Sequence, residues 1–285
     1  MNPLYRSIAA CPACHGTLVW AEAEAGCTCE RCGLSYPMLD GVPFLRVDQH
    51  GTPIPAAAPA APLDPSLRAQ LRKFTDPPDF AYKTPISRNR IPQFVEHLGP
   101  EAVILNLGSG RTNYGLRVVN LDIGPFSNVD VVAMGERLPV GDASLDAVIT
   151  QGVLEHVPDL PATLAEIDRV LRPGGLVYHE IPFIQGFHGS PTDYRRFTLT
   201  GIGELAPGYE VLDAGVACGP SSAMLWISSE WLAMLFSFGN DVLFKAGRRG
   251  FAWLLSPIKL ADAWLEHHPH ADLIASAFYI VARKS

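Results

Sequence analysis

The sequence predicts an α/β fold with a doubly wound, mostly parallel sheet and a small metal-binding module in front of it. From residue 102 onward, short apolar runs alternate with helical patterns, as expected when helices cover a parallel sheet. One apolar run, 103–107, leads directly into a Gly-Ser-Gly turn, and the next ends on Asp122. Paired C-x-x-C motifs near the N-terminus indicate the metal-binding module.

Length and composition exclude several classes of protein. The chain has 285 residues, 48% of them apolar, which suits one large domain plus a smaller module. Its formal net charge of −7 argues against a general nucleic-acid binder, which needs a basic face to neutralise phosphates. The first residues lack the apolar run of a signal peptide, so we expect a cytoplasmic protein.

Five of the six cysteines lie between residues 11 and 32. In a cytoplasmic protein such a cluster favours metal thiolates over disulfides. The two C-x-x-C pairs suit a tetrahedral zinc ion, and four sulfurs leave no open position, so the metal should be structural. Two alternatives stay open: Cys27 competes for ligation, or the module keeps its shape without a full complement of metal. The expected ligands are Cys11, Cys14, Cys29 and Cys32.

The residues after the second cysteine pair, SYPMLDGVPFL at 35–45, carry a family resemblance. They are similar to the zinc-ribbon family related to the small activator protein of tRNA methyltransferases. The resemblance implies a ribbon that can contact a protein partner. We expect a zinc-ribbon domain at 1–48, a Pro/Ala-rich linker at 49–66 and the main domain at 67–285.

Helical spacing over 67–74, 91–98 and 160–171 predicts three helices of the main domain. The segment 80–83 between the first two could cover a cofactor, but plain packing is the favoured interpretation. An Arg-Pro-Gly-Gly sequence should end the third helix. Seven apolar runs are candidate strands: 103–107, 117–121, 129–132, 145–150, 176–181, 209–216 and 275–282.

Three segments that follow the glycine turn decide the class of the domain. They are Glu136–Val148, Gln151–Val157 and Leu171–Gly175, and in this order they resemble class I S-adenosyl-L-methionine-dependent methyltransferases of the type 11 group. The resemblance implies a seven-stranded Rossmann-like methyltransferase sheet with S-adenosyl-L-methionine as cofactor.

The same resemblance implies a cofactor site. The turn would pass under the methionine and ribose, Asp122 would hold the ribose hydroxyls, Ile123 would pack on the adenine, and Gln151 would lie near the sulfonium. The alternative for Asp122 is a helix-cap or turn residue. Asn106 and Met134 stand where the family commonly has acids, and the backbone of Gly135 could replace the second one. The full set of cofactor candidates is Asn106, Gly108, Ser109, Gly110, Asp122, Ile123, Met134, Gly135 and Gln151.

These departures keep a second hypothesis open, a degenerate, non-catalytic copy that acts as a binding module with a partner protein. The interval from Gly110 to Asp122 is also too short for the usual full helix. A nicotinamide-dependent oxidoreductase is disfavoured, because Asn113 stands where the dinucleotide fingerprint needs its third glycine.

Polar residues on the acceptor side lie in a loop at 182–198, expected beside the ligand crevice. They offer a base, a stacking surface and an anion clamp. The alternative is that Asp193 pairs with Arg195 or Arg196 and only orders the loop. For Glu155 and His156, exposed positions on a helix are an equal alternative. The catalytic candidates are His156, His188, Tyr194 and Arg195.

The stretch 219–265 combines apolar helical patterns with Lys and Arg residues. Ser222, Ser229, Glu230 and Ser237 fall on one narrow stripe. Glu230 and the shortness of the first apolar run argue against a spanning helix. A helical cap that encloses the substrate is favoured, and a peripheral membrane contact is the alternative. The sequence leaves the acceptor open among small molecules, sugars and lipid-linked compounds.

Overall fold

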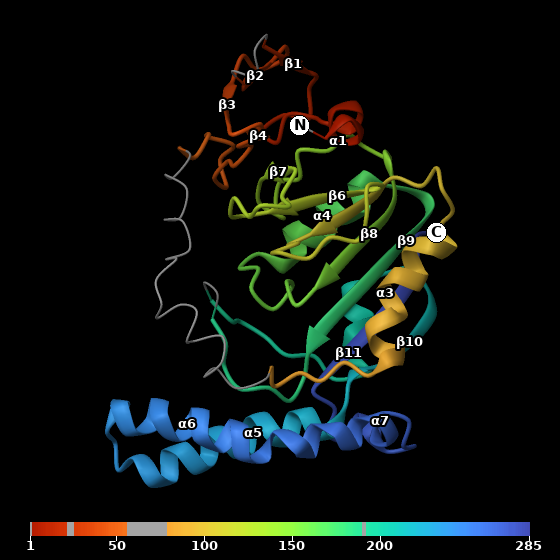
Figure 1. The fold of residues 1–285 in the computed structure, drawn as a ribbon. Helices are drawn as coiled ribbons and strands as arrows, with labels where there is room; N and C mark the ends of the chain where they lie inside the picture. Colours follow the sequence, from red (N-terminus) through yellow and green to blue (C-terminus); the bar gives the residue numbers. More distant parts are fainter. Residues whose placement is uncertain (1, 22–25, 56–78, 190–191) are drawn as a thin grey trace.

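In the computed structural model, residues 2–21, 26–55, 79–189 and 192–285 are described. The N-terminal module forms the red and orange layer at the top of Figure 1. It begins with helix α1 (Pro3–Ile8), which Asn2 caps by accepting a hydrogen bond from the Leu4 N–H. A four-stranded antiparallel sheet follows, in the order β1 (Leu18–Trp20), β2 (Gly26–Cys29), β3 (Ser35–Leu39) and β4 (Val42–Pro43).

The main domain contains a seven-stranded sheet with the order β10-β11-β9-β8-β5-β6-β7. Strands β7, β6, β5, β8 and β9 run parallel, whereas β11 is antiparallel to both of its neighbours. This is the predicted seven-stranded, mostly parallel Rossmann-like sheet. Its strands are β5 (Ile104–Leu107), β6 (Val118–Asp122), β7 (Val131–Val132), β8 (Leu145–Gln151), β9 (Leu171–Pro182), β10 (Glu210–Cys218) and β11 (Ala277–Arg283).

Helices cover both faces of this sheet, which makes it doubly wound. Helix α3 (Pro85–His97) buries Ile91, Phe94 and Val95 against one face, and Thr84 caps its first turn by accepting from the Ser87 N–H. Helix α4 (Leu160–Val170) buries Ile167 and Val170 against the other face. The 3₁₀ turns η2 (Gly201–Leu205) and η4 (Ala271–Leu273) complete the connections.

A helical layer follows β10 and lies beyond one end of the sheet, at the bottom of Figure 1. It consists of α5 (Pro220–Ser237), α6 (Asp241–Leu255), η3 (Ser256–Ala261) and α7 (Asp262–Leu265). The buried Asp262 carboxylate accepts from the Ser221 and Ser222 N–H groups and thereby fixes the start of α5. No helix in the described ranges is long and apolar enough to cross a membrane.

The N-terminal module packs directly on the sheet edge formed by β7. Phe44 forms a parallel bridge with Val132, and the Leu45 N–H donates to the Val132 carbonyl at 2.8 Å. The Tyr5 hydroxyl donates to the Pro139 carbonyl at 3.2 Å inside the interface. One continuous apolar cluster therefore spans both parts of the chain.

Several expected elements differ in extent from those observed. Helix α3 begins six residues before the predicted 91–98, because Thr84 and Pro85 start it earlier and its middle tolerates Pro92. Strand β9 already begins at Leu171, so the Arg-Pro-Gly-Gly turn is counted with the strand. The interval from Gly110 to Asp122 contains a turn and no helix. The helix predicted at 67–74 lies outside the described residues.

Candidate functional site

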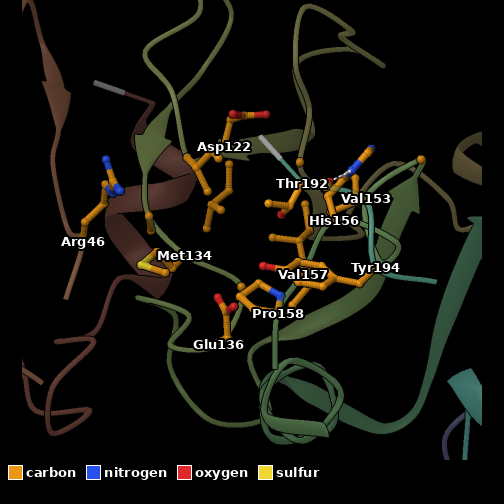
Figure 2. Close-up of a pocket in the computed structure, with 17 residues that line it drawn as sticks. Arg46, Asp122, Met134, Glu136, Val153, His156, Val157, Pro158, Thr192 and Tyr194 are labelled. Carbon is orange, nitrogen blue, oxygen red and sulfur yellow. Dashed lines mark hydrogen bonds between the residues drawn. The ribbon is translucent and has the colours of Figure 1, made fainter. Parts of the chain in front are cut away.

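A pocket of about 360 Å³ opens at the carboxyl ends of β5, β6, β7 and β8 (Figure 2). This volume lies in the usual range for small-molecule sites. Carboxyl ends of parallel strands are also where ligands bind in open α/β sheets. The lining residues are Arg46, Leu107, Gly108, Leu121, Asp122, Ile123, Ala133, Met134, Gly135, Glu136, Gly152, Val153, His156, Val157, Pro158, Thr192 and Tyr194.

The turn after β5 forms one wall of the pocket. Gly108 has φ +70°, and a Cβ placed there would lie 2.4 Å from Val153 Cγ2. The N–H groups of Gly108 and Ser109 both donate to the Leu121 carbonyl, which ties the turn to β6. Glycine is therefore required at position 108 both by its conformation and by its surroundings.

Asp122, the last residue of β6, is held by the turn that it faces. Its Oδ2 accepts from the Gly110 N–H at 2.8 Å, and its Oδ1 accepts from the Gly124 N–H at 2.9 Å. The side chain is 8% exposed and lines the pocket beside Ile123. Asp122 thus has both a turn-forming role and a position from which its carboxylate oxygens can reach ligand hydroxyls.

The remaining cofactor candidates separate into two groups. Met134 and Gly135 line the pocket, whereas Asn106, Ser109, Gly110 and Gln151 are not among its lining residues. The Asn106 amide donates to Asn120 Oδ1 at 3.0 Å, so the residue that replaces the expected acid forms a buried pair with the neighbouring strand. Gly110 acts on the pocket through its hydrogen bond to Asp122.

Gln151 belongs to a polar network next to the glycine turn. Its Oε1 accepts from the Tyr114 hydroxyl at 2.8 Å, and its Nε2 donates to Glu180 Oε2 at 3.1 Å. Lys83 donates to both oxygens of the same Glu180, at 2.6 and 2.9 Å. The 80–83 segment therefore contributes an ion pair as well as packing, in which Phe80 stacks on Trp226.

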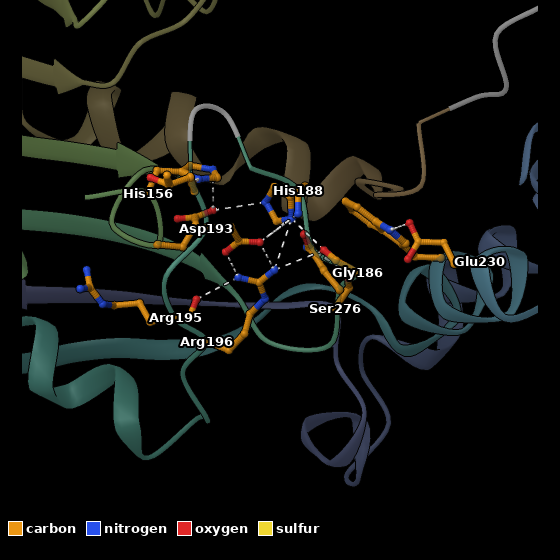
Figure 3. A network of polar contacts seen from close by, with 12 residues as sticks. His156, Gly186, His188, Asp193, Arg195, Arg196, Glu230 and Ser276 are labelled. Atoms are coloured by element: carbon orange, nitrogen blue, oxygen red, sulfur yellow. Dashed lines mark hydrogen bonds and ion pairs between the residues drawn. The ribbon is translucent and has the colours of Figure 1, made fainter. Parts of the chain in front are cut away.

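The catalytic candidates have different positions in the structure (Tyr194 in Figure 2, the others in Figure 3). His156 and Tyr194 line the pocket, while His188 and Arg195 do not. Arg195 donates to the carbonyls of Leu154 and Val157, so it supports the turn after β8. The buried Glu155 carboxylate lies beside His188 and raises the pKa of that imidazole above its usual value, while burial acts in the opposite direction.

Asp193 pairs with Arg196, as the loop-ordering alternative predicts. Both carboxylate oxygens accept from the Arg196 guanidinium, and Oδ2 also accepts from the His188 N–H at 2.9 Å. The guanidinium hydrogen bonds hold the pKa of the Asp193 carboxyl well below its usual range. This pair fixes the loop that carries His188.

Five residues near the site were missed by sequence reasoning. Arg46 comes from the N-terminal module and still lines the pocket, and no motif signals it. Glu180 and Lys83 meet across 97 residues, and their contact depends on the fold. Glu136 and Thr192 also line the pocket. They lie in segments that the sequence associates with the site, but without a residue-specific signal.

The four expected cysteine ligands come together in the N-terminal module. The Sγ atoms of Cys11 and Cys32 are 3.7 Å apart, those of Cys14 and Cys29 are 3.5 Å apart, and all four lie within 4.8 Å of one another. Sulfurs about 2.3 Å from a shared tetrahedral ion would be about 3.8 Å apart. Cys27 is buried outside this cluster, and burial raises the pKa of its thiol to about 12.

Two family models match the sequence. One, described as a methyltransferase domain, matches residues 110–179, and the other, described as Trm112p-like protein, matches residues 7–41. A UPF0434 protein of Burkholderia vietnamiensis is 38% identical to this chain over 65 residues, which is 21% of this chain and 97% of that protein.

Other similar proteins carry the name methyltransferase. A malonyl-[acyl-carrier protein] O-methyltransferase of Serratia marcescens is 36% identical over 74 residues, which is 22% of this chain and 29% of that enzyme. The chain thus spans under a third of that relative. A solved 1,6-didemethyltoxoflavin-N1-methyltransferase of Burkholderia thailandensis has a TM-score of 0.42 at 20% identity, covering 81% of this chain and 94% of that one.

Proposed function

We infer that this chain belongs to the class I S-adenosyl-L-methionine-dependent methyltransferases and carries a Trm112p-like N-terminal domain, and we propose that it methylates a small-molecule, sugar or lipid-linked acceptor. One observation carries the proposal. The methyltransferase-domain match, residues 110–179, includes most of the residues that line a pocket in which a glycine turn and the carboxylate of Asp122 face the same space.

The pocket residues suit the parts of the cofactor. Gly108 would let the backbone approach the methionine and ribose, and Asp122 would accept hydrogen bonds from the ribose hydroxyls. Ile123 and Met134 supply apolar surface for the adenine, and the amide of Gln151 would face the methionine end. When bound, the cofactor supplies an activated methyl group on sulfur for in-line displacement, in which positioning of the acceptor contributes much of the rate.

The cysteine cluster is proposed to hold a structural zinc ion. Cys11, Cys14, Cys29 and Cys32 provide four soft ligands with the spacing of a closed tetrahedral site. Reduced thiolates of this kind fit a reducing, cytoplasmic environment. We further propose that the chain is divided into a ribbon at 1–48, a linker at 49–66 and a catalytic domain at 67–285.

A lipid-linked acceptor is favoured by the surface of the helical layer. Fourteen large apolar side chains that are at least about two-fifths exposed lie between residues 220 and 265, and they include Trp231, Phe238 and Trp264. Residues 242–260 contain four Lys or Arg and no Asp or Glu, in a chain of net charge −7. Exposed aromatic and apolar groups mixed with cations are typical of helices that lie on an anionic lipid surface.

The layer also touches the acceptor side of the site. The His188 and Trp226 ring centroids are 5.3 Å apart, which joins α5 to the loop after β9. An acceptor held at a lipid surface would therefore reach the pocket from the side of this layer.

A labelled-methyl assay tests the proposal. The purified chain is incubated with methyl-labelled S-adenosyl-L-methionine and a bacterial lipid extract, and label is measured in the organic and aqueous phases. We expect label in the organic phase. Label only in water-soluble products would reject the lipid-linked acceptor and keep methyl transfer. Cofactor binding without transfer to any acceptor, together with a co-purified protein held by the ribbon, would favour the non-catalytic binding module.

A further inference from the structure

Three side chains with metal-binding groups meet where the turn after β8 faces the loop after β9. The carboxylate of Glu155 and the imidazoles of His156 and His188 have ligand atoms within 4.8 Å of one another. Figure 3 shows His156 and His188 on either side of this junction. The proposed cofactor contacts do not use this cluster as a whole.

The separations are longer than direct hydrogen bonds. Glu155 Oε1 lies 3.7 Å from the Nε2 atoms of both His156 and His188. Hydrogen bonds between nitrogen and oxygen measure about 2.7–3.2 Å. Ligand atoms about 2.1 Å from a shared tetrahedral metal ion would be about 3.4 Å apart. The observed spacing therefore leaves room for an ion between the three groups.

The second carboxylate oxygen of Glu155 provides independent support. The side chain is 1% exposed, and Oε2 is buried with no hydrogen-bond partner. A buried carboxylate without compensation is costly, and buried charges are generally paired or coordinate metals. A cation at the centre of this cluster would compensate it.

The histidine rings are oriented as metal ligands usually are. His156 Nδ1 lies at hydrogen-bond distance from the Thr192 carbonyl, and His188 Nδ1 is 3.0 Å from the Gly186 carbonyl. Because a carbonyl only accepts, each Nδ1 carries the proton and each Nε2 keeps a lone pair on the Glu155 side. Arg196 also lies near His188 Nδ1, but at the longer distance of 3.4 Å. Backbone carbonyls of this kind commonly orient metal-bound histidines.

The surrounding contacts hold both elements in place. Arg195 donates to the carbonyls on either side of Glu155 and His156, those of Leu154 and Val157. The Tyr194 N–H donates to the Glu155 carbonyl at 2.8 Å, which connects the turn to the loop. The ligand groups are thus preorganised by residues that do not themselves face the ion.

We propose that Glu155, His156 and His188 bind a divalent first-row transition-metal ion of the zinc class at the edge of the pocket. Two imidazoles and a carboxylate suit such ions and leave at least one coordination position open. Because His156 also lines the pocket proposed for the cofactor, an ion held here would lie at the border of that pocket. Holding an acceptor oxygen there is a role that rests on the proposed function, whereas binding of the ion does not.

Cobalt titration of the full chain, loaded with a single equivalent of Zn²⁺ that the four soft thiolates take up, tests the site. Visible d–d absorption without thiolate charge-transfer bands reports a nitrogen and oxygen site and separates it from the cysteine cluster. We expect about one additional Co²⁺ per chain. The variants His188→Ala and Glu155→Gln should weaken this binding at least about 100-fold, since even the loss of groups that orient ligands costs about 10–100-fold.

His267→Ala is the matched control. The His267 ring lies 3.4 Å from Glu266 Oε1 on the surface, so it pairs a histidine with a glutamate away from the proposed site. This variant should bind Co²⁺ like the wild type. If His188→Ala fails to fold, as judged by circular dichroism, His156→Gln takes its place. Equal Co²⁺ affinity in wild type and folded variants, or no nitrogen and oxygen site at all, overturns the proposal.

Titration of the same samples with S-adenosyl-L-methionine separates the two proposals. Co²⁺ binding that depends on His188 and Glu155, without cofactor binding, would uphold the metal site and reject the methyltransferase function. Cofactor binding without a second metal site would reject the metal site and leave the methyltransferase function standing.

Discussion

Gly108 and Gly110 both have positive φ, but their surroundings differ. A Cβ at Gly108 would collide with Val153, whereas one at Gly110 would meet no atom within 4 Å. We expect Gly110→Ala to cost about 1 kcal/mol of unfolding free energy through its backbone conformation alone. Gly108→Ala should cost about 1–3 kcal/mol more through overpacking.

Urea unfolding of each glycine variant, alone and combined with Val153→Ala, forms a double-mutant cycle. The cycle measures how much of the lost unfolding free energy comes from the collision with Val153. The Val153→Ala change should recover part of the loss in Gly108→Ala and none of it in Gly110→Ala. Equal costs for the two glycine variants would contradict the close approach of Gly108 to Val153.

His179, in strand β9, makes the stability of the folded protein depend on pH. The side chain is 1% exposed, its Nδ1 lies 2.8 Å from Thr150 Oγ1, and burial lowers its pKa from 6.5 to about 4. Between pH 6.5 and about 4, the His179 imidazole is protonated in the unfolded chain but stays neutral in the folded chain. Stability is therefore complete above pH 6.5 and falls as the pH decreases toward 4.

The unfolding free energy should fall by about 1 kcal/mol per pH unit between pH 6.5 and 4.5 because of this one residue. Urea titrations of wild type and His179→Gln at several pH values measure it. The variant should show the shallower dependence, and identical slopes would mean that the ring is protonated in the folded protein.

The helical layer should bind anionic vesicles through its exposed apolar side chains. Trp264 is 74% and Phe238 is 87% exposed. In cosedimentation, the wild type should bind vesicles of 7:3 phosphatidylcholine to phosphatidylglycerol. The double variant Trp264→Ser, Phe238→Ser should bind at least about tenfold more weakly, because each substitution removes about 1.5–3 kcal/mol of apolar burial.

Val19→Ser is the control for this measurement, since Val19 is 50% exposed on the N-terminal module at the opposite end of the molecule (Figure 1). Loss of vesicle binding in the control, or none in the double variant, would contradict the assignment of the membrane-facing surface.

At the scale of the whole molecule, the N-terminal module contributes directly to the pocket. Phe44 and Leu45 pair with β7, and the next residue, Arg46, lines the pocket beside Met134. Removing the ribbon metal should therefore loosen the pocket wall. We expect Arg46→Ala and Cys32→Ser each to weaken the binding of S-adenosyl-L-methionine about 5–30-fold in a fluorescence titration, on the order of 1–2 kcal/mol.

Arg6 offers a matched control in the same module, because its guanidinium lies 6.0 Å from the Trp20 ring and does not line the pocket. Arg6→Ala should leave the affinity unchanged. Unchanged affinity in Arg46→Ala and Cys32→Ser as well would show that the module is not coupled to the pocket.

Local patterns predicted the sheet, the glycine turn and the cysteine cluster, because each depends on residues close together in the chain. The apolar runs that end at Leu107 and Asp122 became adjacent parallel strands. The pairing of Asn106 with Asn120 was not predictable, since it depends on the register of those strands. Arg46 enters the pocket only because the module packs on β7, an arrangement that no local pattern encodes.

In the helical layer, too, tertiary packing decides a feature that the sequence of a single helix does not predict. The stripe of Ser222, Ser229 and Ser237 is buried, as a helix packed on a neighbour requires. Which apolar face would remain exposed could not be read from α5, because apolar residues surround most of that helix. The exposed face was decided by the packing of α5 against α6 and η3.

Isothermal titration with S-adenosyl-L-methionine tests the central claim most directly. We predict saturable binding of one cofactor per wild-type chain and an affinity lower by at least about tenfold in Asp122→Ala, because hydrogen bonds to a charged group contribute about 1.5–3 kcal/mol. The exposed Glu101→Gln change at the opposite end of β5 should leave it unchanged. Absence of binding at millimolar cofactor, or equal affinity in wild type and Asp122→Ala, would contradict the account.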